Sequence, residues 1–276
     1  MDRRTILIGS LGSMFSPRST ALMSDQTLPK GKLKDLPALR DYLASLQPIP
    51  KGIFQMGTSD AQSDATPKHS VWMSKFRMGA TPVTVAVWKE YCGATGTKLP
   101  EPPAWGLRDD HPIVNVSWFD IMGADYNGGF CAWASDVAGF QLTLPTEAQF
   151  EYAARGGQSG WMYPWGNSFD NTKLWCSVFT NRNMVAPVFR SNNVYRNAYG
   201  LTDMVGNVWQ LCLDGHRIYE SKTLTDPKGS LNGVLRCKRG GTWWQQQKDI
   251  FRCCHRGFEI SDVATWHQGF RLVSPS

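Results

Sequence analysis

The chain is organised around a C-terminal segment bracketed by Arg239-Gly240-Gly241-Thr242-Trp243 (239–243) and Gly269-Phe270-Arg271-Leu272-Val273 (269–273). The paired glycines predict a tight turn or a close backbone approach, because glycine adopts conformations that other residues avoid. The alternation of apolar and polar residues over 269–273 predicts a half-buried strand. Both ends of the segment therefore look like scaffold.

Between these two blocks the sequence has neither helical nor strand periodicity. A loop that carries aromatic, amide, charged and imidazole groups between two fixed strands is typical of a recognition surface. An ordinary irregular loop is the alternative. The candidate ligand-binding residues are Trp244, Gln245, Gln247, Asp249, Ile250, His255, Gly257, Phe258, Glu259, Ile260, Val263, Thr265, Trp266 and His267.

Composition indicates a globular protein, with 42% hydrophobic and 19% charged residues among 276. The many glycines and tryptophans, 26 and 12, favour short strands and tight turns with large aromatic anchors. The formal charge of +6 comes from scattered Lys and Arg, so a nucleic-acid partner is not expected.

The seven cysteines are an odd number and show no paired Cys-x-x-Cys spacing. This pattern argues against a zinc site and excludes a disulfide framework that uses every thiol. We therefore expect most of the cysteines to be small buried hydrophobic residues.

The N-terminus resembles a twin-arginine export signal, with Arg3-Arg4 before a short apolar run and small residues near 19–21. The run is too short to span a bilayer, so no membrane span is expected. The sequence predicts a leader and short helix over 1–49 and one domain over 50–276. The protein would be exported or displayed at the cell surface, or remain cytoplasmic if the leader is not used.

Local patterns predict several elements. Thr84 and the Thr146/Gln149 capping box mark helix starts, and Gly156 marks a helix end. Glycines within 123–129 predict an interrupted helix. Helices are expected over 36–46 and 84–92, over a segment that includes 130–134, and over 146–156. Strands are expected over 52–57, 71–78 and 111–118, with a further core strand within 197–211.

Seven blocks, in order over about 52–273, resemble the formylglycine-generating enzyme (sulfatase-modifying factor) family. They are 54–57 (FQMG), 112–118 (PIVNVSW), 144–157 (LPTEAQFEYAARGG), 163–167 (YPWGN), 197–209 (NAYGL with VGNVW), 239–243 (RGGTW) and 269–272 (GFRL). The resemblance implies an α+β fold, the irregular C-type lectin-like fold with few helices, short strands and many loops.

In the enzymes of this family, two cysteines after the Gly-Gly block bind copper(I) and activate oxygen. The matching positions here are Gln245 and Ile250, which cannot supply the thiolates that a soft metal needs. The nearest thiols, Cys253 and Cys254, are adjacent and displaced. We therefore predict no catalytic residue and no enzymatic activity, with an oxygen- and metal-dependent oxidase of altered site as the alternative.

The calcium ligands that the resemblance implies are also incomplete. The family's Gly-Asn-x-Trp-Glu carboxylate corresponds to Gln210, which lacks the charge that attracts a hard cation. Asp203 and the backbone oxygens of Gly206 and Val208 leave a weak calcium site as an open alternative. No cofactor and no bound metal are predicted.

Within this family the sequence is most similar to variable proteins of diversity-generating retroelements, whose last segment runs between comparable blocks. Adenine-directed mutagenesis there diversifies Asn codons. Residues reachable from such codons are Asp249, Ile250, His255, Gly257, Phe258, Ile260, Val263, Thr265 and His267, whereas Trp244, Glu259, Trp266 and the glutamines are not reachable. The resemblance thus predicts a non-enzymatic receptor for a protein or glycan ligand, with a catalytically dead structural homologue as another alternative.

Overall fold

The computed structural model describes residues 32–60, 63–124, 128–177, 183–188 and 196–275. The expected twin-arginine leader lies outside these residues. Within them, no helix is long and apolar enough to cross a bilayer.

The α-helices of the described chain are α1 (Pro37–Ala44), α2 (Val85–Thr95), α3 (Trp118–Met122), α4 (Gly129–Ala138) and α5 (Glu147–Ala154). The strands are β1 (Gln47–Ile49), β2 (Gly52–Met56), β3 (His69–Met73), β4 (Phe76–Met78), β5 (Trp209–Gly215), β6 (Leu224–Thr225), β7 (Leu235–Arg239), β8 (Arg256–Ile260), β9 (Gln268–Gly269) and β10 (Val273–Pro275). Short 3-10 turns include η4 (Lys248–Phe251).

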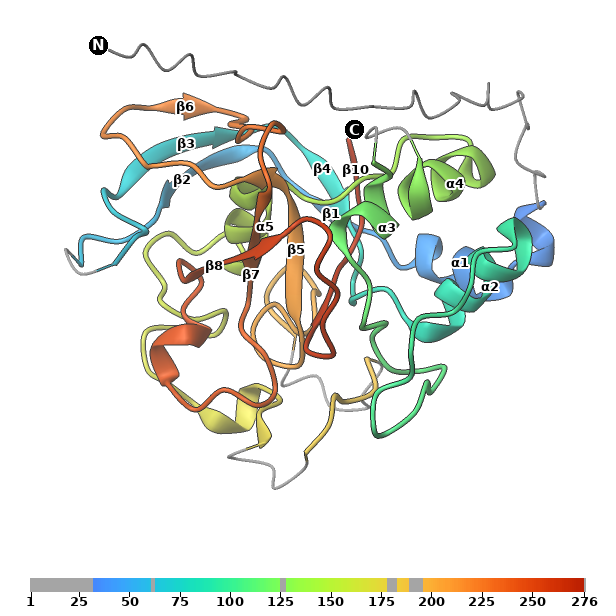
Figure 1. Ribbon diagram of the computed structural model, residues 1–276. Coiled ribbons are helices and arrows are strands. Elements are labelled where there is room, and N and C mark those ends of the chain that lie inside the picture. Colours follow the sequence, from blue (N-terminus) through green and yellow to red (C-terminus); the bar gives the residue numbers. More distant parts are fainter. Residues whose placement is uncertain (1–31, 61–62, 125–127, 178–182, 189–195, 276) are drawn as a thin grey trace, which may run out of the picture.

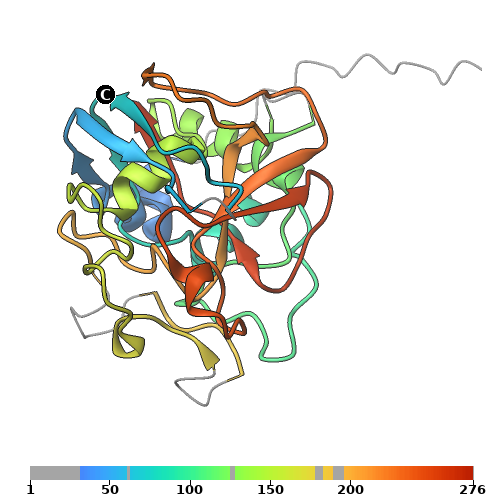
Figure 2. The same ribbon diagram turned by 90° about the vertical axis from the view of Figure 1, so that its left-hand side faces the viewer.

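The strands form small sheets with the orders β1-β4-β10, β2-β3-β6 and β8-β7-β5-β9 (Figures 1 and 2). In the last sheet, β8 and β9 lie at opposite edges. Residues 261–267 therefore carry the chain from one edge to the other. Short strands, few helices and long connections confirm the predicted irregular α+β fold.

Helix α5 lies at the centre of the molecule, behind β5 and β7 in Figure 1. The predicted capping box is present: the Thr146 hydroxyl accepts from the Gln149 N–H, and the Gln149 side chain accepts from the Thr146 N–H. Phe150 and Ala153 face the core as expected. Two carboxylates of this helix, Glu147 and Glu151, are also wholly buried. The helix thus brings negative charge into the protein interior.

Helices α1 to α4 gather on one side around an aromatic core that includes Trp88, Phe130 and Trp133. Thr84 caps α2 as predicted. The Glu90 carboxylate accepts the first free N–H groups of α1 at 2.8 and 2.9 Å, as helix starts require. Strand β1 pairs with β4, so the packed body extends upstream of residue 50, the domain boundary that the sequence predicts.

Three predicted strands differ from the structure. Residues 111–118 form no strand, because their N–H groups bond to loops and Asn115 has a positive φ of 58°. Residues 270–272 lie between β9 and β10 and are wholly buried, so the expected half-buried strand is wrong. Residues 71–78 split into β3 and β4, which join different sheets.

The two glycines after β7 are required for the turn that follows. Gly240 and Gly241 have φ of 95° and 72°, which side-chain-bearing residues rarely adopt. A Cβ on Gly240 would lie 2.8 Å from the Met204 carbonyl oxygen. The turn directs the chain from the buried sheet to the segment that carries the candidate site residues.

Candidate functional site

The β7–β8 hairpin has two chemically different faces. Its register pairs Lys238 with Gly257 and Arg239 with Arg256. Arg239, Arg256 and Cys237 point to the interior, where all three are buried. On the other face, the Lys238 ammonium forms an ion pair with the Glu259 carboxylate at 2.8 Å.

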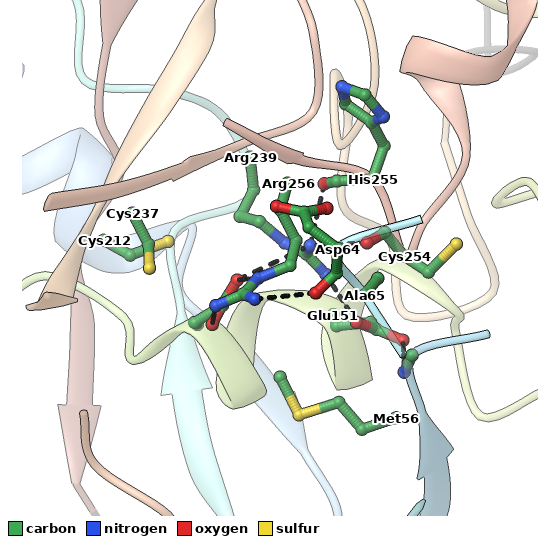
Figure 3. A network of polar contacts seen from close by, with 12 residues as sticks. Met56, Asp64, Ala65, Glu151, Cys212, Cys237, Arg239, Cys254, His255 and Arg256 are labelled. Carbon is green, nitrogen blue, oxygen red and sulfur yellow. Dashed lines mark hydrogen bonds and ion pairs between the residues drawn. The ribbon is translucent and has the colours of Figure 1, made fainter. Parts of the chain in front are cut away.

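Beneath the hairpin, the two buried arginines meet the two carboxylates of α5, and Figure 3 shows Arg239, Arg256 and Glu151. Arg256 donates to both oxygens of Glu147 at 2.7 and 3.0 Å, and Arg239 donates to Glu151. Burial alone would raise the pKa of Glu147, but Arg239 and Arg256 hold it below its ordinary value. The charges are therefore paired, as buried ions must be.

Arg239 also fixes the backbone of the candidate segment from below. Its guanidinium donates to the carbonyl oxygens of Cys253 at 2.9 Å and of Cys254 and His255 at 2.7 Å each. Phe251, the last residue of the η4 turn, is wholly buried and anchors that turn. The main chain of this segment is thus held by groups that do not reach the surface.

The connection over 261–267 is held to α3, to the loop before that helix and to the sheet. The N–H of Phe119 donates to the Ser261 carbonyl at 3.2 Å, and that of Asn115 to the Thr265 carbonyl at 2.9 Å. The buried Arg236 donates to the Ser261 hydroxyl at 3.0 Å. The crossing is therefore fixed at both ends.

No candidate site residue is buried. The exposed ones are Trp244, Gln247, Asp249, Ile260 and Trp266, and the half-buried ones are Gln245, Ile250, His255, Gly257, Phe258, Glu259, Val263, Thr265 and His267. Phe258 packs against the rest of the domain: its ring lies 4.4 Å from the His216 ring and 5.2 Å from the Arg256 guanidinium.

One group of candidate residues borders an open hollow of about 430 Å³. Asp249 and His255 lie on one side of it, and Asp60 and Asp64 come from the loop after β2. Burial, and then the charge of Arg239, lower the pKa of His255 to about 4, so the imidazole is neutral near pH 7. Arg252 also lines the hollow and pairs with Asp249 at 2.8 Å and with Asp60 at 3.6 Å, so this end of the segment is polar and carries both signs of charge.

A second group is aromatic. Trp244, Trp266 and His267 lie within 6.1 Å of one another by ring centroids, beside Trp243 and Trp105. Trp209 joins the two groups, because its ring is 5.9 Å from the His255 ring and its backbone N–H donates to the His267 carbonyl at 2.9 Å.

Several surrounding residues were not predicted from the sequence. Trp105, Asp60 and Asp64 reach the site from distant loops, and no local pattern indicates that contact. The contact of Lys238 could have been predicted, since a lysine within an otherwise buried strand needs a charged partner. That partner is Glu259.

The residues implied as calcium ligands have other contacts. Gln210 is wholly buried; its amide donates to the Asp203 carbonyl and its oxygen accepts from Arg271. The Asp203 carboxylate accepts from Asn207 at 3.0 Å. Among the described residues, no group of three or more His, Cys, Asp or Glu side chains could hold a metal ion.

The cysteines are buried, as the sequence predicts. All seven cysteines are free and buried. Burial raises the pKa of Cys253 to about 12 and also raises that of Cys254. Both thiols are therefore protonated near pH 7, and a protonated thiol is a poor metal ligand.

The sequence profile of the sulfatase-modifying factor enzyme 1-like domain matches residues 39–275. The chain belongs to this family. It is 27% identical to the formylglycine-generating enzyme of Mus musculus over 84% of this chain and 75% of that protein. It is also 36% identical to the inactive C-alpha-formylglycine-generating enzyme 2 of Mus musculus, over 70% of this chain and 56% of that protein.

Among solved structures, Treponema denticola variable protein 1 has a similar fold, with a TM-score of 0.69. The alignment covers 84% of this chain and 95% of that one at 20% identity. The family thus contains proteins named as enzymes and a protein named as inactive, and the fold also occurs in a variable protein.

Proposed function

We propose that this protein is a non-enzymatic receptor that binds a protein or glycan ligand through residues 244–267, and that a diversity-generating retroelement diversifies this segment. One observation carries the proposal: every candidate residue reaches the surface, while Arg239 and Phe251 hold the backbone from the interior. Side chains can change on such a segment without emptying the core. The fold shared with Treponema denticola variable protein 1 supports the same function.

The chemistry of the segment supports binding rather than oxidation. Gln245 and Ile250 occupy the positions that the resemblance assigns to copper-binding cysteines, and the thiols of Cys253 and Cys254 are buried and protonated. We expect purified protein to contain no stoichiometric copper or iron. Either metal at one equivalent, measured by mass spectrometry, would instead favour the oxidase.

A surface receptor must meet its ligand outside the cell. The arginine pair and apolar run at the N-terminus would serve export by a twin-arginine route. Fractionation of cells that express the tagged full-length protein tests this part of the proposal. Uncleaved protein confined to the cytoplasm would remove export without affecting the ligand-binding segment.

Diversification is tested in the DNA beside the gene. We expect a near-copy of the codons for residues 240–272, differing mainly at adenines and lying near a reverse-transcriptase gene. The lack of such a copy would leave a catalytically dead structural homologue as the better description.

A combined variant tests whether the surface side chains of residues 244–267 can change without loss of stability. The variant Asp249→Ser, Ile250→Val, Phe258→Tyr and His267→Asn should keep its free energy of unfolding within about 1 kcal/mol of the parent, as surface changes usually do. The control Phe251→Ala removes the buried anchor and should cost about 3 kcal/mol or more. Urea denaturation measures both, and loss of folding in the combined variant would contradict the proposal.

A further inference from the structure

The aromatic group beside β9 is a connected cluster of rings, two of which are exposed. The ring of Trp266 lies 5.4 Å from Trp243, 6.1 Å from Trp244, 6.4 Å from Trp105 and 5.0 Å from His267, measured between centroids. We call these five residues the aromatic platform. They come from three separate parts of the chain, so the fold itself assembles the platform.

Two rings of the platform are open to solvent. Trp244 is 46% exposed and Trp266 is 42% exposed. Their planes are inclined by 46° rather than stacked, so neither ring covers the face of the other. Large aromatic groups are normally removed from water because each buries a large apolar area. Exposure of two neighbouring indoles therefore marks an interaction surface.

Three buried polar atoms without partners belong to the platform or to the residue beside it in the chain. The Trp243 indole N–H, the Thr265 hydroxyl and Nδ1 of His267 are buried and have no hydrogen-bond partner. Trp243 as a whole is only 7% exposed. An unsatisfied buried polar group costs about 1–3 kcal/mol, so a ligand that supplies the missing partners would gain affinity.

The platform carries no net charge. Burial, and then the nearby charge of Lys238, lower the pKa of His267 to about 4, so its imidazole is neutral near pH 7. Lys238 itself is neutralised by Glu259 at 2.8 Å. The platform therefore offers flat apolar faces together with neutral donors and acceptors, and nothing that selects an ionised ligand.

We propose that the aromatic platform is a carbohydrate subsite for a neutral sugar, bound without a metal ion. A pyranose ring has an apolar C–H face, which fits an indole, and a rim of hydroxyl groups, which can both donate and accept. The sugar stacks on Trp266 and Trp244. A tilt of the exposed Trp266 ring lets the hydroxyl groups of the sugar reach Trp243, Thr265 and His267. This inference rests on the proposed receptor function and specifies its ligand class.

The test is calorimetric titration of the full-length protein with cellohexaose, maltohexaose, mannohexaose and hexa-N-acetylchitohexaose. We expect at least one to bind, with equal affinity in the presence of EDTA. Trp266→Ala and Trp244→Ala should each weaken binding at least tenfold, or about 1.4 kcal/mol. Thr265→Val, which removes the hydroxyl and keeps the shape, should weaken it about threefold or more.

Trp161→Ala is the matched control, because Trp161 is half-buried and lines a different hollow beside Arg155. It should change binding less than twofold, and the melting temperature of each variant shows that it is folded. The inference is overturned if no hexasaccharide binds at millimolar concentration, if folded Trp266→Ala binds as well as the parent, or if EDTA abolishes binding.

Failure of this inference and failure of the proposed function give different results. A template copy beside the gene with no sugar binding would refute the carbohydrate subsite and leave a diversified receptor for a protein. Sugar binding that depends on Trp266, without a template copy, would support the subsite and remove diversification.

Discussion

On the inner face of the β7–β8 hairpin, buried arginines reach helix α5 and the backbone of the following segment, whereas on the outer face the buried Arg236 and Lys238 bond to partners in the same sheet and its flanking loops. Arg239 and Arg256 contact the carboxylates of α5 and the carbonyls of the following segment. Lys238 and Glu259, on the same two strands, contact each other. The backbone carbonyls of residues 253–255 are thus held from the inner face.

Loss of the buried arginine should have the largest effect. Arg239→Met leaves Glu151 without one of its charge partners and frees three backbone carbonyls. Breaking a buried ion pair by removing one partner costs about 3–5 kcal/mol, so we expect a loss of this size in urea denaturation. Arg252→Met, which removes a partly exposed pair with Asp249, should cost about 1 kcal/mol or less. Equal losses in the two variants would contradict the distinction between the buried inner face and the partly exposed segment that follows it.

The buried polar groups around α5 should also respond to pH, since the Glu147 N–H donates to the Asp214 carboxylate at 2.8 Å. Burial, and then the charge of Glu147, raise the pKa of Asp214 to about 6, above the value of about 3.9 in an unfolded chain. Between about pH 4 and pH 6, Asp214 is therefore protonated in the folded state and ionised in the unfolded chain. The contribution of Asp214 to the free energy of unfolding falls as pH rises through this range.

Comparison of the parent with Asp214→Asn isolates this contribution. The difference in free energy of unfolding between the two proteins should change by on the order of 2 kcal/mol between pH 4 and pH 7, in the direction that favours the parent at low pH. Urea titrations across this range measure it. A difference that is constant with pH would show that Asp214 does not bind a proton in the folded state near pH 5.

The smallest effects on stability are expected for substitutions within residues 244–267, where Phe258 should matter more than Asp249. Phe258→Ala should cost about 1–2 kcal/mol, less than a core phenylalanine, because its half-buried ring packs on His216 and Arg256. Asp249→Ser should change stability by about 0.5 kcal/mol or less, since its carboxylate is largely exposed. Thermal denaturation compares the two. A loss at Asp249 equal to that at Phe258 would show that the whole segment is structural.

The sequence predicts the parts of this fold that short-range chemistry determines. The capping box of Thr146 and Gln149, the cap at Thr84 and the turn at Gly240 and Gly241 each depend on neighbouring residues. Buried cysteines also follow from composition. The resemblance to a known family supplied the fold class, which local patterns alone did not specify.

Long-range contacts account for what the sequence did not predict. The apolar pattern over 111–118 is typical of a strand, but its backbone bonds to loops that are distant in the chain. The polar residues within 269–273 read as solvent-facing, yet Arg271 is buried and donates to the Gly79 and Thr202 carbonyls and to Gln210. The site likewise depends on Trp105, Asp60 and Asp64, whose approach no local pattern reveals.

The passage of residues 261–267 from β8 across to β9 sets a limit on how this surface can vary. The two strands stand at opposite edges of one sheet, and three strand spacings of about 4.8 Å separate them. An inserted or deleted residue would shift β9 against β5 and turn Gln268 and Phe270 away from the interior. The proposed diversification would therefore have to exchange side chains at constant length, which copying with base changes provides and recombination between unequal segments does not.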